Sequence, residues 1–224
     1  MRGRLTLVLV VVAAAVAAVV GSGDEVLADV AGATEPQFFD TLGTAGSDDG
    51  ELQNPKGVAV DPESGDVYVA DTGNDRIVRY DADGRLVDIF GTDPIEGLPL
   101  DEPWDVAVSE VAGEVYVADT GNDRVVVFSR FGLPIDTWGS TGSRRQRFRS
   151  PRGIHAGGDG TLYVADTGNN KVKAYNPVTG TFTGSYGTRG SGSGQLNGPR
   201  DVTGDSDHGT RLFIADTGND RISV

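Results

Sequence analysis

The sequence predicts an all-β protein built from four copies of one repeated unit. The tetrapeptide Asp-Thr-Gly-Asn begins at residues 71, 119, 166 and 216. A proline recurs every 48 residues, at Pro55, Pro103, Pro151 and Pro199. A glycine that follows an apolar residue recurs at the same spacing, as Gly43, Gly91, Gly139 and Gly187. Two markers in register over four copies identify an internal repeat, and such a repeat determines the fold.

Each unit contains four short strands, and no segment shows helical periodicity. The expected strands are 58–61, 67–70, 76–80 and 86–90 in the first copy and 106–108, 115–118, 125–128 and 134–138 in the second, with 162–165 and 172–175 in the third and 212–215 in the fourth. Runs of Val, Ile, Tyr and Phe that end at Gly or Asp are typical of strands. Four strands per unit predict a β-propeller of four-stranded antiparallel blades.

The residues that recur in every copy are expected to have structural roles. Proline has no N–H to lose from the ladder, so we expect it at the first position of a strand. In the Asp-Thr-Gly-Asn turn, we expect Asp to accept N–H groups two residues on, Gly to supply a positive φ, and Asn to tolerate one. The structural turn residues predicted in this way are Asp71, Asn74, Asp119, Asn122, Asp166, Asn169, Asp216 and Asn219.

The unit from Pro55 to Asp61, followed by Val67 to Ile77, resembles the NHL repeat, and the resemblance covers residues 37–224. The third copy departs slightly, with Asn170-Lys171 in place of Asp-Arg. The resemblance implies a propeller of six blades, so four copies predict an incomplete six-bladed propeller. The alternative is a four-bladed ring, which the strand 38–42 would close by completing the last blade.

The N-terminus predicts export. Arg2 and Arg4 precede an apolar run from Leu5 to Val20, and small residues follow at 26–28. This order is typical of a secretory signal peptide, and the run is short for a membrane span. We expect a signal peptide (or an N-terminal membrane anchor) over 1–28, a linker over 29–36 and the propeller over 37–224. The protein is then secreted or extracytoplasmic, with membrane attachment only if the first segment stays uncleaved.

One group of residues stands out against the acidic composition. The formal net charge of −14 argues against nucleic acid as a partner. The residue after each proline is nevertheless Lys56, Trp104, Arg152 or Arg200, and all four are expected at one mouth of the propeller channel, with His155 nearby. Arginine suits carboxylates and phosphates, and tryptophan stacks on sugars or cations. The other interpretation is that these are simply rim residues, either exposed or paired with the neighbouring acidic turns.

A second basic feature is the loop before the third copy, which carries Arg144, Arg145, Arg147, Arg149 and Arg152. Two roles are open for it. Either the loop binds an anionic partner, or it pairs with neighbouring acidic loops.

Enzymatic interpretations have less support. The resemblance extends to amidating lyases that hold zinc through several histidines. This chain has only His155 and His208, whereas a catalytic zinc site normally needs three protein ligands. Asp105 and Asp201 are candidate calcium ligands, although no loop has EF-hand spacing. We therefore expect a module that binds a protein, peptide or glycan and has no cofactor. The alternative is a zinc- or calcium-dependent lyase or hydrolase whose remaining ligands lie in missing blades.

Overall fold

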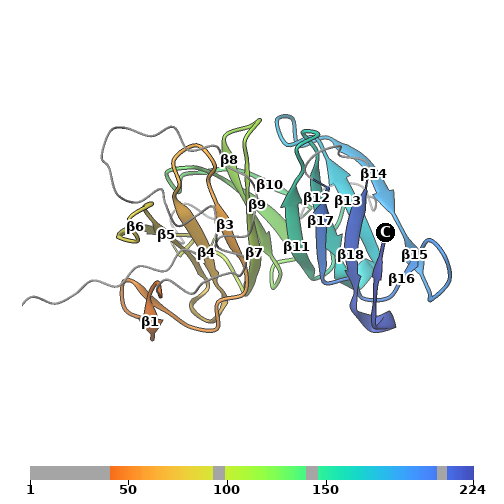
Figure 1. Cartoon of the computed structure of the whole chain (residues 1–224), viewed down its shortest axis with the longest axis horizontal. Helices are drawn as coiled ribbons and strands as arrows, with labels where there is room; N and C mark the ends of the chain where they lie inside the picture. The colour runs from red at the N-terminus through yellow and green to blue at the C-terminus, as the bar shows by residue number, and fades with distance from the viewer. Residues whose placement is uncertain (1–40, 93–98, 140–145, 206–210) are drawn as a thin grey trace, which may run out of the picture. The chain divides into compact units, whose positions relative to one another are not determined.

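The computed structural model in Figure 1 describes residues 41–92, 99–139, 146–205 and 211–224. The chain divides into a segment Met1–Gly43 and a compact unit Thr44–Val224. The predicted signal peptide and linker lie outside the described residues. No helix in the described part is long and apolar enough to cross a membrane.

The compact unit contains four antiparallel sheets, called blades 1 to 4. Blade 1 consists of β3 (Val58–Val60), β4 (Val67–Asp71), β5 (Arg76–Tyr80) and β6 (Leu86–Phe90); blade 2 of β7 (Pro103–Ser109), β8 (Glu114–Asp119), β9 (Arg124–Ser129) and β10 (Pro134–Trp138); blade 3 of β11 (Pro151–Ala156), β12 (Leu162–Asp166), β13 (Lys171–Tyr175) and β14 (Phe182–Tyr186); and blade 4 of β17 (Asp201–Gly204), β18 (Leu212–Asp216) and β19 (Arg221–Ser223). The predicted all-β class and the blade architecture are confirmed.

Two short parallel pairs lie in the loops that lead into blades 1 and 4. They are β1 (Thr44–Ala45) with β2 (Glu51–Leu52), and β15 (Thr188–Arg189) with β16 (Gln195–Leu196). These pairs were not predicted, because two-residue strands leave no periodic pattern.

Strands β5, β6 and β10 begin and end where the sequence predicts. The first strand of blade 2 is longer than predicted, because Pro103 already pairs with the turn residue Asp119 and a bulge separates it from Asp105. The same irregularity follows Pro151, which pairs with Asp166. A bulge redirects the next side chain. Here that side chain belongs to the residue after the proline, Trp104 or Arg152.

The turns between second and third strands differ from the prediction. Three of them form single turns of 3₁₀ helix: Thr72–Asn74, Thr167–Asn169 and Thr217–Asn219. The positive φ belongs neither to the Gly nor to the Asn but to the residue after them, for example Asp75 at 53°. Gly73 is needed for space instead, since a Cβ there would lie 2.6 Å from the Gln53 carbonyl oxygen.

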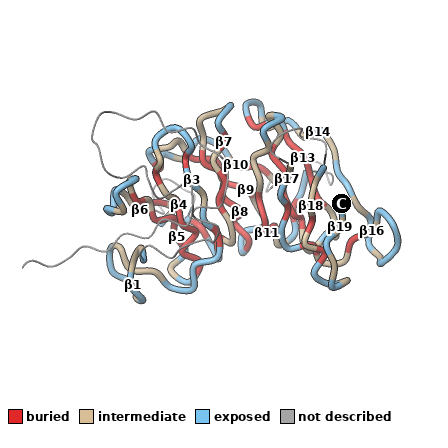
Figure 2. Tube along the Cα trace, viewed as in Figure 1, coloured by how far each residue is buried: buried red, intermediate tan, exposed pale blue. Residues whose placement is uncertain are grey.

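The core lies between neighbouring blades, and Figure 2 shows its buried residues in red along the strands. Tyr68, Ala70 and Ile77 of blade 1 pack against Val117 and Phe128 of blade 2. Between blades 2 and 3, the Trp138 ring lies 5.5 Å from that of Tyr175, with 20° between their planes. Each blade is therefore stabilised mainly by burial against the next one.

The blades follow one another in series. Their first strands β3, β7, β11 and β17 contact one another in that order, and in Figure 1 blade 1 lies on the left while blades 3 and 4 overlap on the right. The four-bladed ring is therefore not the arrangement observed. Thr41 and Leu42 belong to no strand, and residues 38–40 lie outside the described part.

Candidate functional site

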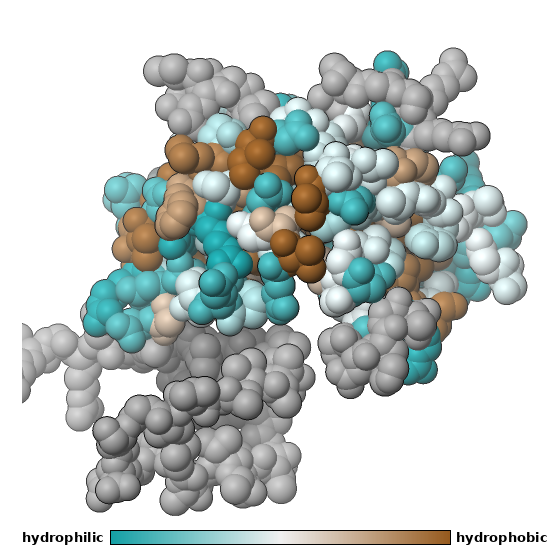
Figure 3. Space-filling model, turned by 90° about the horizontal axis from the view of Figure 1, so that it is seen from above, coloured by the Kyte–Doolittle hydropathy of each residue, from teal (hydrophilic) through white to brown (hydrophobic). Residues whose placement is uncertain are grey.

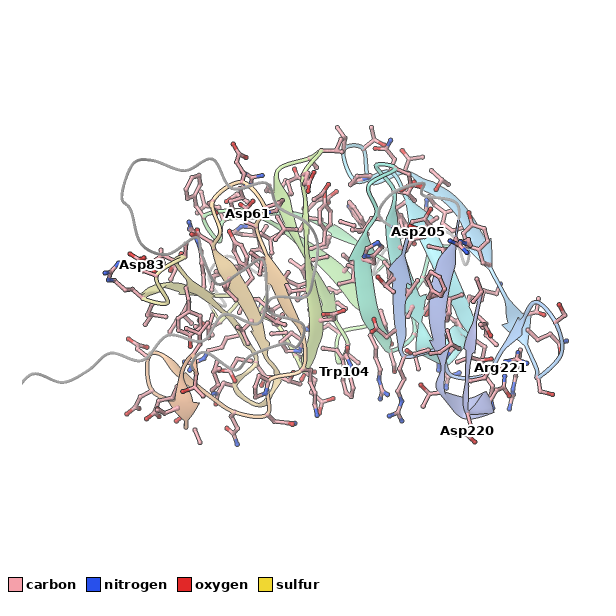
Figure 4. The ribbon with its side chains drawn as sticks, in the orientation of Figure 1. Asp61, Asp83, Trp104, Asp205, Asp220 and Arg221 are labelled. Carbon is pink, nitrogen blue, oxygen red and sulfur yellow. The ribbon has the colours of Figure 1, made fainter. Side chains whose placement is uncertain are left out.

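One end of the blades, called the rim, carries both the starts of the first strands and the Asp-Thr-Gly-Asn turns. The register requires this, because Pro103 pairs with Asp119 across β7 and β8. In Figure 4, Trp104 and Asp220 are labelled at the rim, and Asp61 and Asp205 at the opposite end.

The turn aspartates fasten the incoming loops to the rim. Asp71 is fully buried and accepts three hydrogen bonds: from the Gln53 N–H (2.6 Å), from Asn74 Nδ2 (2.8 Å) and from Arg76 Nε (2.8 Å). The other three turn aspartates have the same three kinds of partner: a backbone N–H, the turn asparagine and a cation. For Asp119 these are Asp101, Asn122 and Arg124. For Asp166 they are Arg149, Asn169 and Lys173, and for Asp216 they are Asn197, Asn219 and Arg221. The expected bond to an N–H two residues on is wrong.

The third copy shows how this clamp tolerates a changed residue. Lys171 occupies the position of the arginine in the other copies, but the cation that pairs with Asp166 is Lys173, whose Nζ lies 2.8 Å from the carboxylate. Lys173 is buried, and its Nζ lies 4.6 Å from the centre of the Phe148 ring. A positive charge therefore pairs with the turn aspartate in the third copy too, although it comes from a residue two positions later in the sequence.

The carboxylates of these clamps are occupied by protein partners. Burial raises the pKa of Asp119, with the hydrogen bonds from Asp101, Asn122 and Arg124 opposing it. For Asp216, burial acts in the same direction but is outweighed by Asn197, Asn219 and Arg221, so that its pKa is lowered. Their chemistry is that of structural groups, not of a ligand site.

Two hydrogen bonds recur at the rim in each of the three junctions between neighbouring blades. The turn threonine donates to the next proline carbonyl: Thr72 to Pro103 (2.7 Å), Thr120 to Pro151 (2.5 Å) and Thr167 to Pro199 (2.7 Å). The residue with positive φ accepts an N–H from the next blade: Asp75 from Glu102 (2.7 Å), Asp123 from Ser150 (2.6 Å) and Asn170 from Gly198 (2.9 Å). Sequence reasoning missed both bonds, because their partners lie one blade away.

The residues after the prolines lie side by side and form what we call the rim row: Lys56, Trp104, Arg152 and Arg200. Lys56 Nζ lies 5.3 Å from the Trp104 ring centre, and Arg152 Cζ lies 4.2 Å from it. Burial lowers the pKa of Arg152, and the nearby positive charge of Arg200 lowers it further, while Glu102 opposes both. Trp104 is thus flanked by two cations.

The rim row is short of negative partners. No ion pair among the described residues involves Lys56, Arg152 or Arg200, whereas Arg76 and Arg124 each pair with a turn aspartate. The Arg152 Nε is buried and has no hydrogen-bond partner in the described part of the chain. Of the alternative interpretation, the ion pairs with the acidic turns are not observed, whereas Lys56 and Arg200 are exposed as it expected.

His155 is placed differently from the rim row. It lies half-buried in β11, and burial lowers its pKa, with Asp159 and Asp201 opposing. No hydrogen bond, ion pair or ring contact among the described residues joins His155 to the rim row. His208 lies outside the described residues.

The two candidate calcium ligands are engaged by the backbone. Asp105 accepts the N–H groups of Val106 and Ile154, each at 2.9 Å, and burial raises its pKa to about 7. Asp201 accepts the Val202 N–H at 2.8 Å. Over the ranges that the structure describes, no three His, Cys, Asp or Glu side chains gather in a way that suits a metal ion.

The basic loop before blade 3 is only partly described, since Arg144 and Arg145 lie outside the described residues. Arg147 and Arg149 are exposed. The Arg147 carbonyl accepts a hydrogen bond from Lys173 Nζ, and the Arg149 N–H donates to Asp166 at 2.8 Å. At Arg147 and Arg149 the backbone is therefore held by hydrogen bonds, while both residues are exposed.

The opposite end of the blades carries exposed apolar side chains, and Figure 3 views the molecule from that side. Val111, Phe131, Leu133 and Val178 lie in its turns and are each at least 60% exposed. No polar constellation comparable to the rim row occurs among them.

Comparisons with known proteins agree with the fold. The model of the NHL repeat matches residues 52–80, 100–128 and 148–175. No curated protein matches the chain. A streptogramin B lyase structure has 18% sequence identity and a TM-score of 0.59, covering 84% of this chain and 57% of its own. A virginiamycin B lyase from Staphylococcus aureus has 17% identity and a TM-score of 0.57, with coverages of 83% and 54%.

The structure of a nidogen–laminin complex is similar as well, with 21% identity, a TM-score of 0.57 and coverages of 74% and 57%. This chain therefore spans about half the length of the solved structures named here, and at these identities the likeness concerns the fold alone. The repeat match and the four blades together show that this chain belongs to the NHL-repeat β-propeller family.

Proposed function

We propose that this protein is an exported binding module whose rim row holds an acidic peptide segment of a partner protein. The observation that carries the proposal is Arg152. Its guanidinium stacks 4.2 Å from the Trp104 ring centre, no described carboxylate pairs with it, and its Nε is buried without a hydrogen bond. Because Arg152 as a whole is only half-buried, a ligand carboxylate would pair with the accessible part of its guanidinium and not with the buried Nε.

Physical chemistry favours this class of ligand. A guanidinium offers a planar fork of donors that matches a carboxylate. Because Trp104 already orders Arg152, less side-chain entropy is lost when the ligand binds. Lys56 and Arg200 are exposed on either side and add positive potential along the row. An extended peptide with several carboxylates would contact more than one of these cations.

The comparisons support a binding role only in general terms. Solved structures with this fold include a nidogen–laminin complex and a protein described as an auxiliary nutrient binding protein from Bacteroides ovatus. The lyases show that the fold also carries catalysis. Metal analysis of the purified protein separates the two classes. Stoichiometric zinc or calcium would favour the metal-dependent alternative.

Trp104 provides a direct readout of binding. The chain has two tryptophans, and the other, Trp138, is buried between blades. In a Trp138→Phe background, an octaglutamate peptide should change the Trp104 fluorescence, whereas an octalysine peptide should not. Raising the salt concentration should weaken the binding of octaglutamate, since the row is partly exposed.

The decisive variant combines Trp104→Ala with Arg152→Ala, followed by calorimetry instead of fluorescence. We expect at least a tenfold loss of affinity for octaglutamate, because interface arginines and tryptophans commonly contribute more than ~1 kcal/mol each. The control is Arg85→Ala, which removes an exposed cation at the other end of blade 1. Equal affinity in the double variant and the control would exclude the rim row as the binding site.

A further inference from the structure

The rim of blade 3 carries a concentration of positive charge. In addition to Arg152 it has three cations, which we call the basic strip: Arg147, Arg149 and Lys171. At the equivalent positions, each of the other copies has a single cation, the arginine that pairs with its turn aspartate. No ion pair among the described residues involves a member of the basic strip. Blade 3 thus gathers positive charge at its rim, in a protein whose formal net charge is −14.

Lys171 has no part in the clamp of the third copy. The arginine at its position in the first copy, Arg76, donates from Nε to Asp71 at 2.8 Å. In the third copy Lys173 supplies the cation instead, with its Nζ 2.8 Å from the Asp166 carboxylate. The clamp is therefore complete without Lys171, and the ammonium group of this half-buried residue is available to a ligand.

The basic strip extends outward from the rim row along blade 3. Arg152 belongs to β11, the first strand of the blade. Arg149 lies beside the turn between β12 and β13, where its carbonyl oxygen accepts a backbone N–H at 2.8 Å. The Arg147 carbonyl oxygen accepts a hydrogen bond from Lys173 of β13. Lys171 lies on the same face of β13 as Lys173, because alternate residues of a strand share a face. The four cations thus follow one path from the first strand to the third.

The rim of blade 2 has the opposite charge. It exposes Asp101 and Glu102 at the positions that Arg149 and Ser150 occupy in blade 3. In the described ranges, no hydrogen bond or ion pair engages the side chain of Asp101 or Glu102. Burial lowers the pKa of Arg152, and the negative charge of Glu102 opposes this effect across the junction. An acidic ligand is therefore attracted by blade 3 and repelled by blade 2.

We propose that the acidic segment held at Arg152 continues outward over blade 3, where the basic strip binds a second group of its carboxylates. This inference rests on the proposed function, because the rim row and the basic strip meet at Arg152. Arg147 and Arg152 are five residues apart, so their Cα atoms are separated by at most about 18 Å, whereas an extended octapeptide spans about 26 Å. A single acidic side chain cannot reach both groups. The site therefore selects a run of acidic residues.

Calorimetry with octaglutamate, on protein produced from the full chain, tests this path. Arg147→Ala with Lys171→Ala should bind the peptide about fivefold more weakly than the unaltered protein, since each exposed ion pair contributes modestly. The control is Arg85→Ala with Arg211→Ala, which removes two exposed cations from the opposite end of the blades and changes the net charge equally.

The double variant of the rim row, Trp104→Ala with Arg152→Ala, separates the two proposals. If it weakens binding while the variant of the basic strip binds as tightly as its control, the rim row stands and the path along blade 3 is wrong. If the unaltered protein does not bind octaglutamate, the proposed function and the path are both wrong.

Removing the negative charge of blade 2 should strengthen binding. Asp101→Asn with Glu102→Gln should bind octaglutamate about threefold more tightly, because two repulsive charges are lost beside the path. The control is Asp83→Asn with Glu110→Gln, which removes two exposed carboxylates at the opposite end. Equal affinity in the two variants would contradict the repulsion by blade 2. Tighter binding of dextran sulfate than of octaglutamate to the unaltered protein would assign the basic strip to an anionic polysaccharide and overturn the peptide.

Discussion

The Asp105 carboxylate of blade 2 accepts the Ile154 N–H of blade 3 at 2.9 Å, although 49 residues separate them in sequence. On its other side, Asp105 fills the space that a side chain at Gly57 of blade 1 would need, since a Cβ there would lie 2.2 Å from Asp105 Oδ1. This partly buried acid of blade 2 thus contacts both blade 1 and blade 3. Both the protonation of Asp105 and its close packing against Gly57 can be tested by experiment.

Replacing Asp105 by Asn should remove a pH dependence of stability. Burial raises the folded-state pKa to about 7 from the ordinary 3.8, so between these pH values the folded state binds more protons than the unfolded state. The free energy of unfolding contributed by this group therefore falls as pH rises through this window and is level above it. We expect a loss of a few kcal/mol in the parent protein relative to Asp105→Asn.

Urea denaturation at intervals from pH 4 to pH 8 measures this difference. The control is Asp83→Asn, whose side chain is 69% exposed. Parallel pH profiles for the parent protein and Asp105→Asn would contradict the assignment.

Gly57→Ala should destabilise the junction of blades 1 and 2. The added Cβ would lie 2.5 Å from the Asp105 Cα, and backbone cannot move aside as a flexible side chain can. Overpacking of this kind costs about 1–3 kcal/mol. Gly184→Ala is the control, because no atom lies within 4 Å of its added Cβ. Thermal unfolding of both variants decides the matter, and equal melting temperatures would rule out the predicted clash.

Asp119→Ala should be among the most damaging single changes at the rim. It leaves Arg124 and the Asp101 N–H without the acceptor that they share. Removing one partner of a buried ion pair costs about 3–5 kcal/mol. Asp83→Ala breaks the exposed pair with Arg85 and should change the unfolding free energy by less than ~1 kcal/mol. Chemical denaturation of the two variants side by side gives the comparison, and similar losses would show that burial of the pair has no special weight.

The two tryptophans should separate stability from binding. Trp138 packs between Tyr116 and Tyr175, with ring centres 5.3 and 5.5 Å away, so Trp138→Ala should lower the unfolding free energy by about 3–5 kcal/mol. Trp104→Ala opens no core and should cost less than ~1 kcal/mol. Differential scanning calorimetry measures both variants. A large loss in Trp104→Ala would assign that residue to the fold instead of to a ligand.

The repeated sequence predicts the number of blades and the position of most strands, because the central residues of a strand are chosen by local residue preference. The spacing of 48 residues also predicts that Trp104 and Arg152 lie side by side, since equivalent positions of successive blades are neighbours. The first and last residues of a strand are harder to predict from the sequence. Pro103 joins its ladder only because Asp119 pairs with it across the sheet.

The contacts that sequence reasoning missed all depend on segments that meet only after folding. Asp71 was expected to accept a backbone N–H two residues on, but the backbone N–H that it accepts belongs to Gln53, 18 residues earlier. Lys173 replaces the usual arginine from two residues further along, which only the side-chain direction in β13 reveals. Likewise, the lack of a hydrogen-bond acceptor for the Arg152 Nε among the described residues depends on the neighbouring side chains and not on its position in the repeat.

The hydrogen bonds at the rim junctions have a consequence for how the molecule comes apart. Each joins residues 27 to 32 positions apart, so every bond connects a blade to the next one only. Cooperativity then passes along the row from neighbour to neighbour, as in a one-dimensional array. Blades 2 and 3, which are held on both sides, should be the last to exchange their amide protons. A whole repeat can accordingly be gained or lost without rewriting the interfaces of the others.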